Sequence, residues 1–132
     1  MEGVVMSKTV VIVGIDPVYL DLPNDAGPVD ASLTAESIID GLEKSRQHLQ
    51  DLGHRAVVVL TDLGETAVET VLNALDETPA DVVVIGAGIR IIAKNTELLE
   101  RLVNGIRAHA PATRLAFNIA PDDSEVAALR WL

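Results

Sequence analysis

Three runs of the chain are nearly continuous in valine, isoleucine and leucine: Lys8 to Ile15, Arg55 to Thr61, and Asp81 to Gly86. A strand with one solvent-facing side alternates between apolar and polar residues, whereas an unbroken apolar run is typical of a strand covered on both faces. Such strands occur mainly in parallel sheets, because helices then cover both faces. The three runs therefore predict neighbouring strands of a parallel sheet.

A fourth run, Thr113 to Ile119, alternates in polarity. One of its faces carries Leu115, Phe117 and Ile119, and the other carries Arg114, Ala116 and Asn118. This pattern favours a less buried strand at an edge of the sheet.

Apolar residues recur at helical spacing between and after these runs. The first stripe comprises Ala35, Ile38, Leu42, Leu49 and Leu52, and it ends at Gly53, a residue suited to a left-handed helix terminus. The second comprises Val68, Val71, Leu72 and Leu75, preceded by Asp62 and Glu65 at the spacing of a capping box. The third comprises Leu99, Leu102, Val103, Ile106 and Ala110, starting near Asn95 or Thr96 and stopping before Pro111. Asp122 and Glu125 predict a similar start for a closing helix through Leu132.

The order of elements is therefore β-α-β-α-β-α-β-α. Right-handed crossovers favour a sheet ordered 2-1-3-4 with helices on both faces. This is an α/β fold, a three-layer α/β/α sandwich with a four-stranded parallel sheet, which is flavodoxin-like or Rossmann-like but one strand short of the flavodoxin pattern. We expect one domain over residues 8–132 after an N-terminal extension of residues 1–7.

Composition narrows the classes of protein. The chain has 132 residues, no cysteine and a formal net charge of −10. It therefore lacks cysteine chemistry, and its charge repels nucleic acid and anionic membranes. No apolar run approaches the length of a membrane span, and the N-terminus lacks a signal-peptide pattern. We expect a cytoplasmic protein that binds neither nucleic acid nor membranes.

A ligand of such a fold binds beyond the carboxyl ends of the strands, where strand order reverses. The third strand ends there in Gly86, Gly88 and Arg90. The glycines let backbone amides approach an anion, and Arg90 supplies a forked donor. The alternative is that the glycines only permit a tight turn. The sequence assigns no cofactor.

Other polar residues are expected at the same edge. Asp16 and Asp62 end the first and second strands, where they either act as a carboxylate pair or serve as turn and helix caps. Tyr19 lies in the long segment Asp16 to Pro28, which is either a binding lid or a disordered insertion. Asn118 either contacts a ligand or ties down the loop before Pro121. The three histidines predict no metal site and no catalytic triad here.

Several sharper hypotheses fail on particular positions. Val82 to Gly88 has the beginning of a dinucleotide-binding fingerprint, but Ile91 stands where its third glycine belongs. The phosphorylated aspartate of receiver domains is replaced by Ile85-Gly86, and the chain lacks a Walker loop and the flavodoxin phosphate loop.

The stretches Val82 to Arg90, Leu102 to Pro111 and Arg114 to Asn118, with the ending Arg130 to Leu132, resemble small bacterial proteins of no assigned function. The resemblance implies a Rossmann-like fold and transfers no catalytic residue. Two functions stay open. The first is a domain that binds a small polar or anionic ligand, and the sequence does not decide whether it is an enzyme. The second is a noncatalytic scaffold that forms a homodimer through the fourth strand and the C-terminus.

Overall fold

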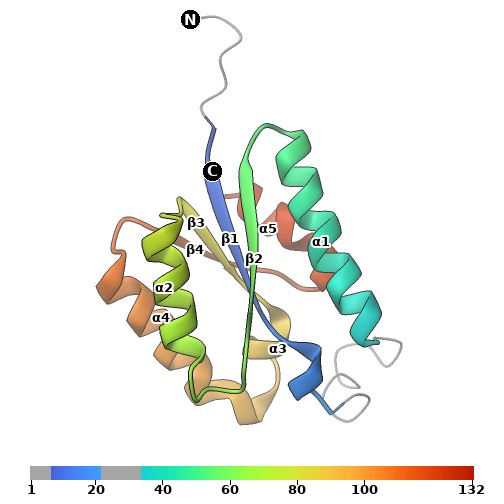
Figure 1. Cartoon of the computed structure of the whole chain (residues 1–132), viewed down its shortest axis with the longest axis vertical. Coiled ribbons are helices and arrows are strands. Elements are labelled where there is room, and N and C mark those ends of the chain that lie inside the picture. The colour runs from blue at the N-terminus through green and yellow to red at the C-terminus, as the bar shows by residue number, and fades with distance from the viewer. Residues whose placement is uncertain (1–6, 22–33) are drawn as a thin grey trace, which may run out of the picture.

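The computed structural model describes residues 7–21 and 34–132. Four parallel strands form one sheet in the order β2-β1-β3-β4, and helices cover both of its faces (Figure 1). The strands are β1 (Thr9–Ile15), β2 (Arg55–Thr61), β3 (Val82–Ile85) and β4 (Arg114–Phe117). The predicted fold class and strand order are confirmed.

The helices are α1 (Ala35–Asp51), α2 (Ala67–Glu77), α3 (Ala87–Arg90), α4 (Thr96–His109) and α5 (Ser124–Leu129). Three single turns of 3-10 helix accompany them: η1 (Pro17–Tyr19), η2 (Ala93–Asn95) and η3 (Pro121–Asp123). Helices α1 and α5 pack on one face of the sheet, and α2 and α4 pack on the other. No helix of the described ranges is long and apolar enough to span a membrane.

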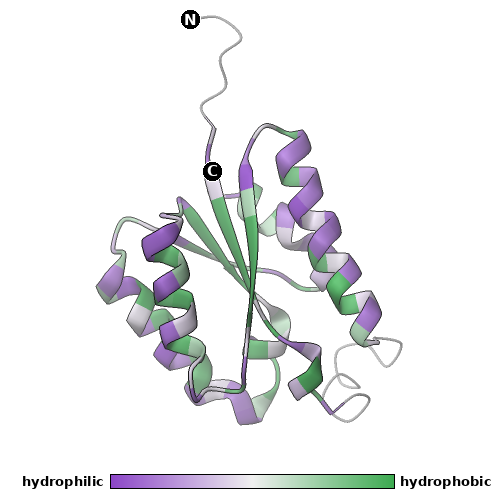
Figure 2. Ribbon diagram, in the orientation of Figure 1, coloured by the Kyte–Doolittle hydropathy of each residue, from purple (hydrophilic) through white to green (hydrophobic). Residues whose placement is uncertain are grey.

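Burial on both faces explains why the sequence of the central strands is nearly all apolar. In β1, Val11, Val13 and Ile15 belong to the core under α2 and α4, while Val10 and Ile12 belong to the core under α1 and α5. Figure 2 shows the strands as apolar along most of their length. Burying alternate residues in two cores removes the need for polar positions, because neither face meets water.

Strand β4 is an edge strand, as the sequence predicts, since β3 is its only neighbour in the sheet. It ends at Phe117, before the predicted limit at Ile119. The amide of Ile119 instead donates to the carboxylate of Asp123, at 3.0 Å, and so joins the turn before α5.

The predicted start and end of the closing helix, α5, are wrong in detail. The carboxylate of Asp123, rather than that of Asp122, accepts backbone hydrogen bonds before α5, and this helix ends at Leu129 instead of Leu132. Glu125 instead contacts Nδ1 of His48 on α1, at 2.5 Å. The partner that a carboxylate finds across the fold therefore decides its role, which sequence spacing alone does not reveal.

The predicted capping box of Asp62 and Glu65 is also wrong, because α2 begins only at Ala67. Asp62 caps the turn before the helix: its carboxylate accepts from the Gly64 amide at 2.9 Å and from the Thr66 hydroxyl at 2.8 Å. These two hydrogen bonds, in that order, hold the pKa of Asp62 below its ordinary value. At the predicted C-terminal end of α1, Gly53 has the expected left-handed φ of 90°.

We predict that Asp62→Asn makes the protein less stable at neutral pH and less sensitive to acid. Because the folded pKa of Asp62 is lowered, its contribution to stability is present above the unfolded pKa of about 3.9 and is lost as the pH falls through the folded value. Urea unfolding at a series of pH values tests this. The difference in stability between the two proteins should begin to shrink as the pH falls below about 4 and vanish below the folded pKa, and a difference that stays constant with pH would contradict the proposed origin.

Candidate functional site

A cavity of about 240 Å³ opens at the carboxyl ends of β1 and β3. Strand β1 is followed by α1 on one face of the sheet, and β3 is followed by α4 on the opposite face. The two connections diverge at this point, so a crevice forms where strand order reverses. The lining residues are Gly14, Ile15, Leu20, Ile38, Leu42, Gly86, Ala87, Gly88, Ile92, Asn118, Ile119, Ala120 and Pro121.

Two of the predicted site residues, Gly86 and Gly88, line this cavity, and an added side chain would have a different effect at each. The Gly86 amide donates to the Val13 carbonyl at 2.9 Å, and a Cβ at Gly86 would lie 3.1 Å from the same oxygen. A side chain there would push β3 away from β1. Gly88 has no atom within 4 Å of the position of an added Cβ, so its missing side chain leaves open space.

Asn118, another predicted site residue, also lines the cavity and is almost fully buried. Its Oδ1 accepts from the Ala87 amide at 2.7 Å, and its Nδ2 donates to the Ser124 hydroxyl at 2.9 Å. A backbone N–H can only donate, so the Ala87 contact fixes which end of the side-chain amide is oxygen. The structure thus shows the role of tying down the loop, and ligand contact by Asn118 stays a prediction.

The hydrogen bonds of Asn118 leave part of its capacity unused. A primary amide offers two N–H donors and two lone pairs on its oxygen. Ala87 uses one lone pair and Ser124 uses one N–H. One N–H donor and one lone pair of Asn118 are therefore not used by these two hydrogen bonds.

The rest of the wall is apolar. Leu20 lies just after η1, Ile38 and Leu42 lie on α1, and Ile92 lies between α3 and η2. No residue that lines the cavity within residues 7–21 and 34–132 has an ionisable side chain. Ile119 is 72% exposed although it lines the cavity, so the cavity opens to solvent on that side.

Arg90 does not line the cavity. Its Nη2 donates to the Asn118 carbonyl oxygen, and its guanidinium lies 5.2 Å from the centre of the Phe117 ring. The buried Nε of Arg90 lacks a hydrogen-bond partner among the described residues. The arginine thereby joins α3 to the end of β4, and its predicted role in anion binding remains a prediction.

The remaining predicted residues also lie outside the cavity lining. Asp16 Oδ1 accepts from the Val18 amide at 3.1 Å and so caps η1. The carboxylate of Asp62 is held in the turn before α2. Tyr19 is about half exposed and immediately precedes the lining residue Leu20. Of the predicted loop, Asp16 to Asp21 is described, and residues 22–28 lie outside the described ranges.

No group of three histidine, aspartate or glutamate side chains in the described parts of the chain is arranged to hold a metal ion. His48 and His109 instead contact carboxylates of neighbouring helices, Glu125 and Asp76. The second contact, at 2.7 Å, joins His109, the last residue of α4, to α2.

Sequence reasoning missed the apolar side of the site. Ile38 and Leu42 were expected only as part of a helix stripe that faces the core. Both lie in the first half of α1, which begins near the edge of the sheet where the strands end (Figure 1). Core positions at the start of a helix that follows a parallel strand are thus candidates for a cavity wall. The sequence predicted Asn95 only near the start of a helix, and its Nδ2 donates to the Gly88 carbonyl at 3.0 Å.

Comparison with known proteins adds no relative: no protein-family model matches the chain, and neither a curated protein nor a solved structure matches it significantly. The resemblance to small bacterial proteins therefore stays a prediction. Function has to be argued from the geometry of the cavity.

We predict opposite effects of alanine at the two glycines. Gly86→Ala should destabilise the protein by about 1–3 kcal/mol, since its Cβ meets the Val13 carbonyl within the sheet. Gly88→Ala should be neutral or stabilising by up to about 1 kcal/mol, because alanine favours helix over glycine and finds free space. Urea unfolding measures both. Equal destabilisation by the two substitutions would show that the space at Gly88 is absent.

Proposed function

We propose that this domain binds a small molecule in the cavity at the carboxyl ends of β1 and β3. The observation that carries the proposal is the open space at Gly88 beside Asn118, whose buried amide has one donor and one acceptor left. Ligand sites of this fold class lie at the point where strand order reverses, and they combine apolar walls with a few placed polar groups. This cavity has both properties.

Size limits the part of a ligand that the cavity can enclose. A cavity of about 150 Å³ holds one benzene molecule, so about 240 Å³ holds about ten non-hydrogen atoms. A whole dinucleotide is much larger than this. The ligand is accordingly a fragment-sized molecule, or one group of a larger molecule that extends past Ile119 into solvent.

The lining residues support binding of a ligand without catalysis. Catalysis by acid, base or nucleophile requires a histidine, carboxylate, lysine, cysteine or activated hydroxyl within reach of the reacting atoms. None of these groups belongs to the described residues that line the cavity.

A fragment screen by NMR tests this function. Titration of uniformly ¹⁵N-labelled protein with molecules of about ten non-hydrogen atoms should shift the amide signals of Gly14, Gly86 and Gly88. Gly88→Leu should abolish these shifts by filling the space, and Ala108→Leu, which adds leucine to an exposed position on α4, should preserve them. A screen in which no fragment perturbs the cavity, or in which Gly88→Leu binds like the wild type, would overturn the proposal.

A homodimer is the second candidate function. Five large apolar residues are exposed between the end of β4 and the C-terminus: Phe117, Ile119, Val126, Leu129 and Trp131. The open edge of β4 is partly covered, because Arg130 Nη2 donates to the Phe117 carbonyl at 3.0 Å. This arrangement favours side-chain packing between two copies of α5 over pairing of two β4 strands.

We predict that the mass of the wild type in analytical ultracentrifugation rises with concentration toward that of a dimer. Val126→Lys places a charge in the proposed contact and should leave a monomer at the same concentrations. Leu52→Lys changes a similarly exposed residue at the end of α1 and should leave the dimer intact. A wild type that stays monomeric throughout would exclude the homodimer.

A further inference from the structure

We infer that the cavity selects an uncharged group with a flat apolar body and a carboxamide-like head that pairs with Asn118. This inference deepens the proposed binding function and rests on it. Three features of the cavity carry it: the absence of charge from the described lining, the unused hydrogen-bonding capacity of Asn118, and the open space at Gly88.

The charge of the ligand follows from the groups that surround the cavity. An ion that leaves water without a partner loses several kcal/mol of hydration free energy. The two aspartates at this edge, Asp16 and Asp62, already accept backbone hydrogen bonds outside the cavity. The guanidinium of Arg90 is directed to a backbone carbonyl and to the Phe117 ring.

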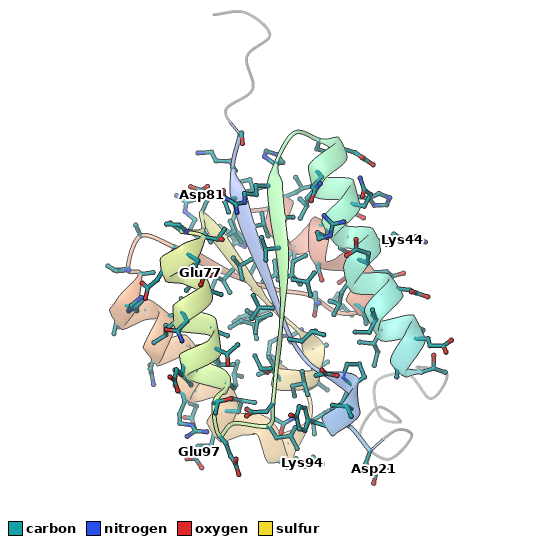
Figure 3. All side chains as sticks on the ribbon, viewed as in Figure 1. Asp21, Lys44, Glu77, Asp81, Lys94 and Glu97 are labelled. Carbon is teal, nitrogen blue, oxygen red and sulfur yellow. The ribbon has the colours of Figure 1, made fainter. Side chains whose placement is uncertain are left out.

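Two further charged residues, Asp21 and Lys94, lie toward the same end of the sheet, whereas Asp81 lies at the opposite end (Figure 3). Neither Asp21 nor Lys94 lines the cavity, and each takes part in another interaction. The described lining therefore offers no ionised partner to a buried anion or cation, and an uncharged group is favoured.

The head group follows from the amide of Asn118. Its remaining N–H requires an acceptor, and its remaining lone pair requires a donor. Leaving either of them unpaired in a filled cavity costs about 1–3 kcal/mol. A primary amide or a lactam supplies an acceptor and a donor side by side, whereas a ketone supplies only an acceptor and a carboxylate lacks a donor. An amide head is thus the best complement.

The body of the ligand follows from the floor and walls. Gly88 forms the open part of the floor, since nothing lies within 4 Å of an added Cβ there, and Ile38, Leu42 and Ile92 present methyl and methylene groups. A flat ring can approach such a floor closely while its edge contacts the aliphatic wall. An aromatic ring with one amide substituent also matches the volume, at about ten non-hydrogen atoms.

Three probes of equal size separate the parts of this inference. Benzamide, acetophenone and benzoate have the same number of non-hydrogen atoms and differ only in the head group, which is respectively a donor and acceptor, an acceptor alone, and an anion. We expect NMR titration to give a Kd for benzamide about tenfold lower than that for benzoate, with acetophenone between them. The amide signals of Gly86 and Gly88 should report the binding.

Variants locate the interaction. Asn118→Asp keeps an oxygen toward the Ala87 amide and replaces the N–H donors with acceptors, so acetophenone should lose its only partner while benzamide can still donate to the carboxylate. The preference for benzamide over acetophenone should therefore increase. Gly88→Leu should abolish binding of all three probes without disturbing Asn118, which protects the test if Asn118→Asp fails to fold. Ala108→Leu should bind the probes as the wild type does.

Each contrary outcome has a distinct meaning. Tighter binding of benzoate than benzamide would overturn the inference on charge and restore an anionic ligand. Equal binding of benzamide and acetophenone would overturn the pairing with Asn118. Cavity shifts with other fragments, but with none of these three probes, would overturn the ligand class and leave the proposed function intact. If no fragment shifts the amide signals of the cavity, both this inference and the proposed binding function are overturned.

Discussion

The direct contact between the backbones of β1 and β3 is the constraint from which the rest of the site follows. The Gly86 amide reaches the Val13 carbonyl at 2.9 Å, and an added Cβ would crowd that oxygen. Parallel pairing places the ends of the two strands side by side, and the following helices then pack on opposite faces. Gly14 in β1 and Gly86 just after β3 keep side chains out of this contact, and the cavity lies between the diverging connections.

Side chains around this contact hold the cavity open. Asn118 bonds the start of α3 through Ala87 and the start of α5 through Ser124, so one buried amide joins two connections. Asn95 bonds the Gly88 carbonyl from the other side. Because buried polar groups are costly to leave unpaired, these bonds fix the position of α3. A pre-formed cavity of this kind needs little reorganisation when a ligand enters, which lowers the cost of binding.

The fold was predictable because burial on both faces leaves a strong signal in the sequence. The valine and isoleucine runs of β1 and β3 mark buried strands, and the similar run of β2 forms a half-buried strand at the other edge. The handedness of the crossovers then orders the sheet. Local details were not predictable in the same way. The α3 turn is held by Asn118, whose Oδ1 accepts from the Ala87 amide 31 residues away in sequence, and Glu125 meets His48, 77 residues away. Only the folded chain brings these partners close.

The candidate site was predictable in its position and in part of its composition. Gly86, Gly88 and Asn118 follow from their places at the ends of strands, since those ends share one edge of a parallel sheet. The direction of Arg90 does not follow, because the α3 turn carries it toward Phe117 and away from the cavity. The sequence therefore suggested a small polar or anionic ligand, whereas we propose an uncharged one from the apolar lining.

A crystal structure determined after soaking in isopropanol tests the central claim most directly, because small organic molecules collect in open apolar cavities. The account predicts that isopropanol lies against Gly88, with its hydroxyl within hydrogen-bond distance of the Asn118 amide. A structure in which Leu20 or Ile92 fills the space beside Gly88, or in which isopropanol binds only elsewhere, would contradict it.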